Sequence, residues 1–114
     1  MSEDCLFCKI IAGELPSNKV YSDDEVYAFH DISPAAPVHV LLIPKKHMSA
    51  VNDADTESQA LLGNLLLKAN DIAAQLGLAD DGFRYVINTG KNGGQTVFHL
   101  HLHILGGKRM PWPP

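Results

Sequence analysis

The sequence of 114 residues is long enough to bury a modest hydrophobic core and too short to need a second domain, so we expect residues 1–114 to form a single domain. Hydrophobic residues make up 46% and charged residues 19%, a balance typical of soluble globular proteins and far from the composition of a disordered or membrane protein. The net charge of −4 argues against binding to nucleic acid or to anionic membranes, because both depend on clustered Lys and Arg.

The N-terminal segment MSEDCLFCKI has neither the basic start nor the sustained apolar stretch of a secretory signal. No apolar run approaches the roughly 18 residues that span a bilayer. Two cysteines are too few for a disulfide framework. We therefore expect a cytoplasmic protein with reduced thiols.

The first half of the chain predicts one short helix and three strands. Asp4 can cap a helix that runs to about residue 12, where a glycine follows. Residues 19–22 and 25–31 are rich in Val and aromatic residues and flank an acidic turn, which is typical of a β-hairpin. The near-continuous apolar run 38–44 predicts a buried strand that ends at its proline.

The second half predicts a long helix and two more strands. Apolar residues recur at helical spacing over residues 55–76, and Gly77 supplies the stop. Residues 83–90 and 97–105 are expected to be strands joined by a glycine-rich turn. The expected fold class is therefore α+β, with a five-stranded, mostly antiparallel sheet, one long helix and one short helix.

The last expected strand carries three histidines at every second position, His99, His101 and His103, which we call the histidine ladder. Because side chains alternate along a strand, the three imidazoles should share one face. The opposite face should enter the core through Phe98, Leu100, Leu102 and Ile104. Clustered imidazoles repel one another when protonated and need partners when neutral, so a purely structural role is disfavoured.

Two kinds of chemistry fit the ladder. The three histidines could hold a catalytic zinc with an open water position, as in a metallohydrolase. Alternatively, one imidazole could act as a nucleophile or general acid and base, oriented by its neighbours. The preceding loop supplies flexible backbone, an amide and a hydroxyl that could surround a phosphate, namely Gly93, Gly94, Gln95 and Thr96.

The motif HLHLHIL resembles the His-x-His-x-His-x-x signature of the histidine triad (HIT) family. The segments HDISPAAPVHVLLIPKKH, NTG, GGQTVFH and the final WPP are similar to its Hint branch, and the resemblance spans nearly the whole chain. It implies a HIT-like fold, a homodimer, and a hydrolase that cleaves purine nucleoside phosphoramidates, such as adenosine 5′-phosphoramidate, to a nucleoside monophosphate and an amine.

The resemblance also implies roles for individual residues. His101 would be the nucleophile that forms a covalent nucleotidyl-histidine, with His103 and His39 at the phosphate and leaving group and His99 supporting the array. Asp31 would accept the ribose hydroxyls. The phosphate would be surrounded by Asn88, Gly94, Gln95 and Thr96, and the base by Leu6, Phe7, Ile10, Phe29, His30 and Ile32. Many members of the branch carry serine where this chain has Thr96.

Cys5 and Cys8 are three residues apart and should share one helix face. Their spacing is that of a zinc half-site, and the resemblance to some bacterial HIT proteins implies that His47 and His99 would complete a structural Zn²⁺ site. Such a metal would be structural, with no cofactor required for catalysis. The alternative is a pair of small buried thiols. A thioredoxin-like redox site is disfavoured, since no strand precedes the pair.

The proline-rich C-terminus leaves Trp112 exposed on a monomer, so a partner subunit is expected to cover it. Besides the metallohydrolase, a second alternative to the phosphoramidase is a nucleotide-binding scaffold protein that keeps the pocket and acts through a partner. No nucleic-acid or membrane partner is expected.

Overall fold

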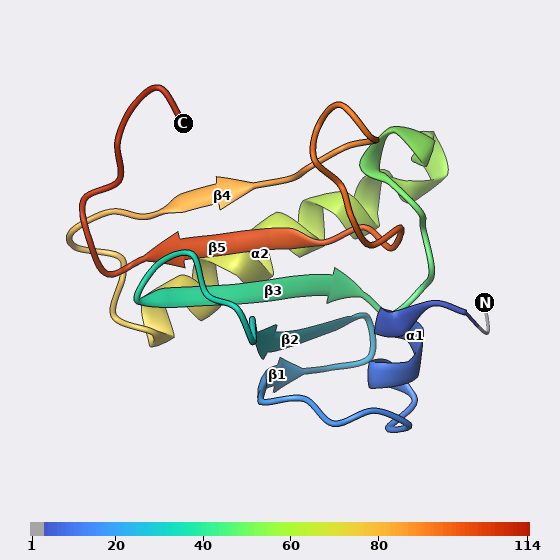
Figure 1. Cartoon of the computed structure of the whole chain (residues 1–114). Helices are drawn as coiled ribbons and strands as arrows, with labels where there is room; N and C mark the ends of the chain where they lie inside the picture. The colour runs from blue at the N-terminus through green and yellow to red at the C-terminus, as the bar shows by residue number, and fades with distance from the viewer. Residues whose placement is uncertain (1–3) are drawn as a thin grey trace.

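The computed structural model describes residues 4–114 and has a five-stranded antiparallel sheet with one helix on each face (Figure 1). The strand order is β1-β2-β3-β5-β4. The strands are β1 (Lys19–Ser22), β2 (Val26–His30), β3 (Val38–Pro44), β4 (Arg84–Val86) and β5 (Leu102–Gly106). The predicted fold class is confirmed. Within residues 4–114, no helix is both long and apolar enough to cross a membrane.

The long helix α2 (Gln59–Gln75) covers one face of the sheet. It follows two short 3₁₀ turns, η1 (Val51–Asp53) and η2 (Thr56–Ser58), and its buried residues pack against alternate residues of the strands. The core between them contains Val26, Ala28, Val40, Leu42, Leu65, Ala69, Ile72, Ala73, Leu100, Leu102 and Ile104. Burial of this apolar surface is the main force that holds α2 to the sheet.

The short helix α1 (Leu6–Ile11) lies at one end of the other sheet face and packs through a second, smaller apolar cluster. Its N-cap is Cys5, not the predicted Asp4: the Cys5 Sγ accepts a hydrogen bond from the Cys8 backbone N–H at 3.3 Å. Gly13 ends the helix in a left-handed conformation (φ +79°), which is the usual role of glycine at this position.

The last strand is shorter than predicted. β5 begins at Leu102, whereas the sequence predicted a strand over 97–105. Leu100 leaves the sheet because its N–H donates to the Met48 carbonyl at 2.6 Å. The expectation that Phe98 enters the core is wrong, since it is 53% exposed, while Leu100, Leu102 and Ile104 are buried as predicted.

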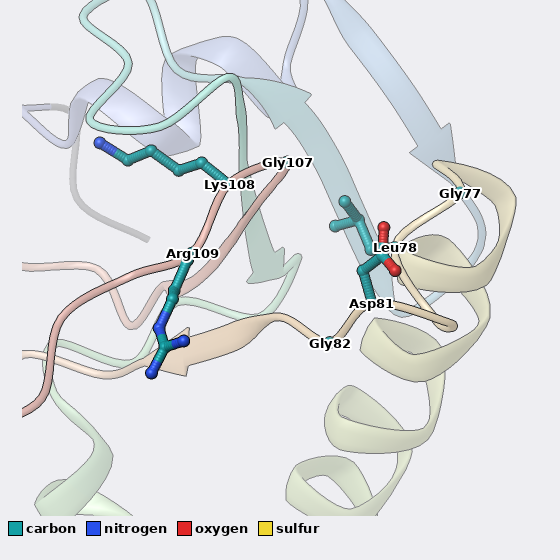
Figure 2. Close-up of a pocket in the computed structure, with 7 residues that line it drawn as sticks. All are labelled: Gly77, Leu78, Asp81, Gly82, Gly107, Lys108 and Arg109. Carbon is teal, nitrogen blue, oxygen red and sulfur yellow. The ribbon is translucent and has the colours of Figure 1, made fainter.

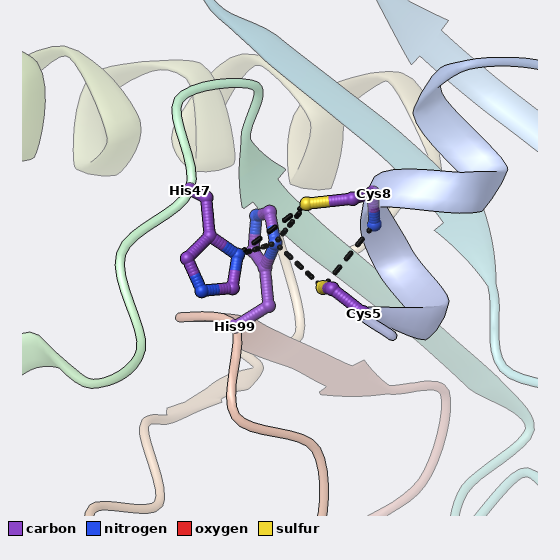
Figure 3. Close-up of side chains that lie close together, drawn as sticks. All are labelled: Cys5, Cys8, His47 and His99. Atoms are coloured by element: carbon purple, nitrogen blue, oxygen red, sulfur yellow. Dashed lines mark hydrogen bonds between the residues drawn. The ribbon is translucent and has the colours of Figure 1, made fainter. Parts of the chain in front are cut away.

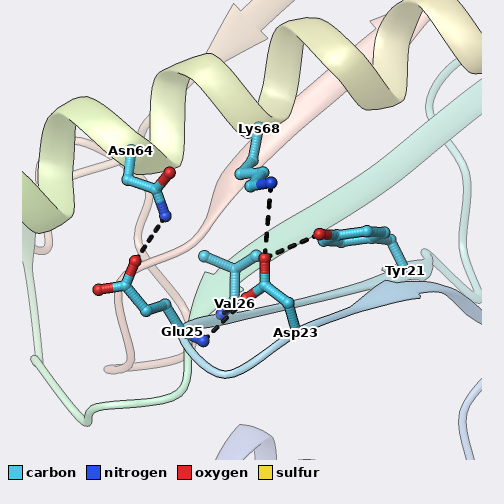
Figure 4. A network of polar contacts seen from close by, with 6 residues as sticks. All are labelled: Tyr21, Asp23, Glu25, Val26, Asn64 and Lys68. Atoms are coloured by element: carbon cyan, nitrogen blue, oxygen red, sulfur yellow. Dashed lines mark hydrogen bonds and ion pairs between the residues drawn. The ribbon is translucent and has the colours of Figure 1, made fainter.

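A polar network fastens the turn between β1 and β2 to helix α2 (Figure 4). The Asp23 carboxylate accepts hydrogen bonds from the backbone N–H groups of Glu25 and Val26 at 2.8 and 2.9 Å and from the Tyr21 hydroxyl at 2.8 Å. Lys68 of α2 lies 3.8 Å from the same carboxylate. A single side chain therefore closes the turn and links it to the helix.

We predict that Asp23→Ala lowers the free energy of unfolding by about 1–2 kcal/mol, because two backbone donors and a hydroxyl lose their acceptor. Urea denaturation measures the change. Asp24→Ala, in the same turn and exposed, is the matched control and should alter stability by less than about 0.5 kcal/mol. Equal effects of the two substitutions would show that the network contributes nothing.

Candidate active site

Two histidines from neighbouring strands form a pair on the sheet face opposite α2. His39 lies on β3 and His103 on β5, where Leu41 is the register partner of His103. The His39 Nε2 and His103 Nδ1 atoms are 2.8 Å apart. The antiparallel pairing of the two strands thus brings together residues that are 64 positions apart in the chain.

The protonation of this pair follows from its partners. The backbone N–H of Ala35 donates to the His39 Nδ1 at 3.0 Å, so that nitrogen carries no proton. The His39 Nε2 must then carry it and donate to the His103 Nδ1, which leaves the proton of His103 on Nε2. Burial lowers the pKa of His103 to about 4, helped by the nearby His101 and His39. Burial also lowers the pKa of His39 despite the Asp31 carboxylate, so both rings are neutral near pH 7.

His101 has the opposite tautomer. Its Nδ1 lies 2.8 Å from the His99 carbonyl oxygen, and a carbonyl can only accept a hydrogen bond. The His101 Nδ1 therefore donates, and the lone pair is on Nε2. The ring is buried between Phe7 and His103, with ring centroids 5.1 and 5.0 Å away. A neutral imidazole with a free ring nitrogen is a competent nucleophile.

A cavity of about 380 Å³ opens beside His101 and His103. Its lining includes ten of the predicted site residues: Leu6, Phe7, Ile10, Phe29, His30, Asp31, Ile32, Thr96, His101 and His103. It also includes five that the sequence did not indicate: Leu15, Pro16, Ser17, Leu41 and Val97. Leu41 could have been found, because it alternates with His39 on one strand, whereas residues 15–17 carry no comparable signal.

The glycine-rich loop lies next to the cavity and is fixed by the Gln95 side chain. Its Oε1 accepts from the Gly90 N–H at 2.9 Å, and its Nε2 donates to the Ser49 and Val97 carbonyls at 2.6 and 3.1 Å. The buried amide of Gln95 thus makes its hydrogen bonds within the protein. Asn88 likewise holds the loop by donating to the Gly93 carbonyl at 2.8 Å.

Glycine at position 93 is required by close packing of the backbone. A Cβ atom there would lie 2.3 Å from the Thr89 carbonyl oxygen, which is far inside contact distance. Gly94 has φ +80°, a conformation that other residues rarely adopt. The predicted residues Asn88, Gly94 and Gln95 therefore shape the loop, and of the four predicted phosphate-side residues only Thr96 lines the cavity.

The side chains of Cys5, Cys8, His47 and His99 lie close together (Figure 3). The Nδ1 atom of His99 is 3.3 Å from the Cys5 Sγ, 3.6 Å from the Cys8 Sγ and 3.2 Å from the His47 Nδ1, and the Cys8 Sγ is 3.4 Å from the His47 Nδ1. A tetrahedral zinc with its usual bond lengths sets nitrogen and sulfur ligands roughly 3.3–3.8 Å apart. The three sulfur–nitrogen distances fall in that range, the distance between the two histidine nitrogens is just below it, and all four ligand atoms lie within 4.8 Å of one another, so the cluster is close to the arrangement that such an ion needs.

The tautomer of His99 also suits a metal. Its Nε2 is 2.7 Å from the Pro44 carbonyl, so Nε2 donates and the Nδ1 lone pair faces the two thiols. Burial lowers the pKa of His99, although the hydrogen bond to Pro44 opposes this shift. The ring is 0% exposed and neutral, as a metal ligand must be.

The three ladder histidines do not converge on one point. Among residues 4–114, the groups spaced to hold a metal are the Cys5 cluster and the set Asp31, His39 and His103, and His101 is in neither. The geometry therefore gives no support to a catalytic zinc held by the ladder.

A larger hollow of about 520 Å³ lies near the C-terminal end of α2 (Figure 2). It is lined by Gly77, Leu78, Asp81, Gly82, Gly107, Lys108 and Arg109. The side chains of Lys108 and Arg109 point away from Asp81 in this view. This hollow contains no histidine or thiol, so the smaller cavity beside His101 is the candidate active site.

Comparison with known proteins agrees with this geometry. The HIT domain family profile matches residues 12–110. An uncharacterised HIT-like protein of Synechocystis is 59% identical over 114 residues, which is all of this chain and 99% of the relative. The purine nucleoside phosphoramidase of Escherichia coli is 49% identical over 108 residues, covering 95% of this chain and 91% of that protein.

The crystal structure of a HIT family hydrolase from Legionella pneumophila superposes with a TM-score of 0.96 at 49% identity, covering 97% of this chain and 99% of that one. A histidine triad protein from Clostridium difficile superposes with a TM-score of 0.94 at 46% identity, over 97% of this chain and 96% of that one. The fold, the histidine geometry and the relatives agree. The chain belongs to the HIT family and is a HIT family hydrolase.

Proposed function

We propose that the protein hydrolyses purine nucleoside phosphoramidates, such as adenosine 5′-phosphoramidate, through a nucleotidyl-histidine on His101. The observation that carries the proposal is the hydrogen bond from the His101 Nδ1 to the His99 carbonyl, which leaves the Nε2 lone pair for attack beside the cavity. The relative named purine nucleoside phosphoramidase supports the substrate class.

The first step is attack by the His101 Nε2 on the α-phosphorus. The new N–P bond forms as the bond to the amine breaks; the departing nitrogen takes a proton from a water molecule, which becomes hydroxide, while the His103 Nε2–H donates a hydrogen bond to the leaving group and keeps its proton. The neutral His39 donates to the His103 Nδ1 and so keeps that proton on the correct nitrogen. That hydroxide then attacks the phosphorus and breaks the bond to the His101 Nε2, which releases the nucleoside monophosphate and a neutral His101.

The rest of the cavity suits a nucleoside. Its lining is largely apolar, with walls from Leu6, Phe7, Ile10, Phe29 and Ile32 and with His30 beside them, which favours a purine face. The Asp31 carboxylate is fixed by the Ser33 N–H at 2.8 Å and lies 3.5 Å from the His39 Nε2. Its remaining acceptor sites suit the ribose hydroxyls, while Thr96 would border the phosphate from a loop that Asn88, Gly94 and Gln95 hold in shape.

A homodimer completes the proposed assembly. Strand β4 is at the edge of the sheet and leaves backbone groups for pairing. Leu66 and Leu67 on α2 are exposed, and Trp112 is 81% exposed. The Arg84 side chain of β4 donates to the Pro111 carbonyl at 2.7 Å, which holds the tail near the same edge. A second copy paired at this edge would cover these apolar residues.

We further propose that the cluster of Cys5, Cys8, His47 and His99 binds one structural zinc. The zinc would hold α1 against the segment that leads into β5, and catalysis would need no cofactor. Metal ligation requires reduced thiols, which agrees with a cytoplasmic location.

Replacement of the nucleophile is the direct test of function. His101→Ala should lower kcat for adenosine 5′-phosphoramidate by at least about 1,000-fold, because the covalent route is lost, while AMP binding is retained. His30→Ala, which removes an imidazole from the same cavity without touching the attacking atom, should lower kcat far less. Near wild-type turnover by His101→Ala would contradict the proposal, and AMP binding without turnover in the wild type would favour a scaffold role.

Asp31→Asn should raise KM for adenosine 5′-phosphoramidate by about 10-fold, because the ribose hydroxyls lose a charged acceptor. Steady-state kinetics with this substrate and with a phosphoramidate that lacks ribose measures the difference. Asp24→Asn is the control for the loss of one surface carboxylate. Equal KM changes on both substrates would show that Asp31 does not recognise the sugar.

Metal analysis tests the zinc proposal. Purified protein should contain about one zinc per chain, and Cys8→Ser should retain much less. Removal of the metal should lower the unfolding temperature, since the ion binds the folded state alone. Wild-type protein that carries well below one zinc per chain and unfolds at the same temperature with and without added zinc would refute it.

A further inference from the structure

The nucleophile cannot be held in place through its own reacting atom. The His101 Nδ1 is anchored by the His99 carbonyl, but the Nε2 lone pair must stay free of donors if it is to attack phosphorus. One hydrogen bond leaves the ring free to tilt about its side-chain torsions. The orientation of the Nε2 end must therefore come from packing.

Phe7 supplies that packing. Its ring meets the His101 ring at 90° with centroids 5.1 Å apart, an edge-to-face contact of the kind that aromatic pairs prefer. On its other side, His101 contacts the ring of His103, which is itself tied to His39. A phenyl ring has no polar donor, so it restrains the imidazole without occupying the Nε2 lone pair.

Phe7 is itself held firmly. Its side chain is only 4% exposed, and its ring also contacts Phe29 and His99 at centroid distances of 5.5 and 5.9 Å. The residues Cys5 and Cys8 on either side of it belong to the cysteine and histidine cluster. Phe7 thus links that cluster directly to the nucleophile.

We propose that Phe7 is a positioning residue for His101, which keeps the imidazole in the orientation that aims Nε2 at the phosphorus, in addition to forming part of the base pocket. The inference rests on the proposed function. It separates Phe7 from Leu6, the preceding residue, which lines the same cavity but is 47% exposed and has no ring to contact His101.

The two roles predict different kinetics. A residue that only walls the base pocket acts on substrate binding, whereas one that orients the nucleophile acts on the chemical step. Phe7→Leu should lower kcat for adenosine 5′-phosphoramidate by about 10-fold or more with KM changed by less than about 3-fold. Leu6→Ala, the matched control, should raise KM more than it lowers kcat. Phe7→Tyr keeps the ring and should restore most of kcat.

A measurement without substrate separates this inference from the proposed function. In ¹⁵N NMR of the free protein, the wild type should show His101 as a single, sharp tautomer protonated on Nδ1. Phe7→Leu should broaden or shift the His101 signals while those of His39 stay in place, and Phe7→Tyr should preserve them. If the wild type fails to cleave the phosphoramidate, the proposed function fails, and the NMR comparison still tests Phe7.

The inference is overturned if Phe7→Leu leaves kcat within about twofold of wild type, or raises KM alone, and leaves the His101 signals unchanged. Thermal unfolding and the His39 signals verify that the variant is folded. Should Phe7→Leu not fold, Phe7→Met provides the same loss of the ring with a flexible side chain that fills irregular gaps. Wild-type kcat in folded Phe7→Met would equally refute the inference.

Discussion

The hydrogen bond between the His101 Nδ1 and the His99 carbonyl is the constraint on which the site depends, and it requires a departure from regular strand structure. In a regular strand, carbonyl groups lie close to the plane of the sheet and side chains stand perpendicular to it. A ring could not easily reach the carbonyl two residues earlier. The chain turns out of the sheet before Leu102, and this turn lets the His99 carbonyl meet the His101 ring.

The spacing of apolar residues along the chain predicted the strands and helices well where burial alone decides structure. The apolar run 38–44 coincides with β3, and the expected helix over 55–76 contains α2. The alternation of apolar residues and histidines over 97–105 placed the start of β5 too early. Leu100 is buried as a strand residue would be, yet its N–H bonds to the Met48 carbonyl in a distant loop. A periodic pattern reports which side chains are buried and carries no information about the partner of each backbone group.

For the candidate active site, too, the sequence predicted some features and could not predict others. The histidine ladder is visible in the sequence, and the family resemblance indicated most of the cavity walls. The tautomers could not be read from the sequence, because they depend on contacts such as the Ala35 N–H with His39 and the Pro44 carbonyl with His99. Gln95 is another example, since its side chain bonds to the Gly90 N–H of its own loop and to the Ser49 carbonyl of a distant segment. The hydrogen-bond partners that the fold supplies, and not the residue type alone, set these roles.

His99 connects the cysteine and histidine cluster to the proposed nucleophile, His101. Its Nε2 donates to the Pro44 carbonyl, its Nδ1 faces the two thiols, and its own carbonyl accepts from the His101 Nδ1. Any force that fixes the His99 ring also limits the motion of the backbone that carries this carbonyl. Phe7, between the two cysteines, contacts the ring of the same His101 edge to face and is proposed to restrain it. Both restraints begin in the first turn of a six-residue helix, which is too short to be stable without such contacts. The cluster therefore gives a marginal helix contacts that support it as one wall of the candidate active site.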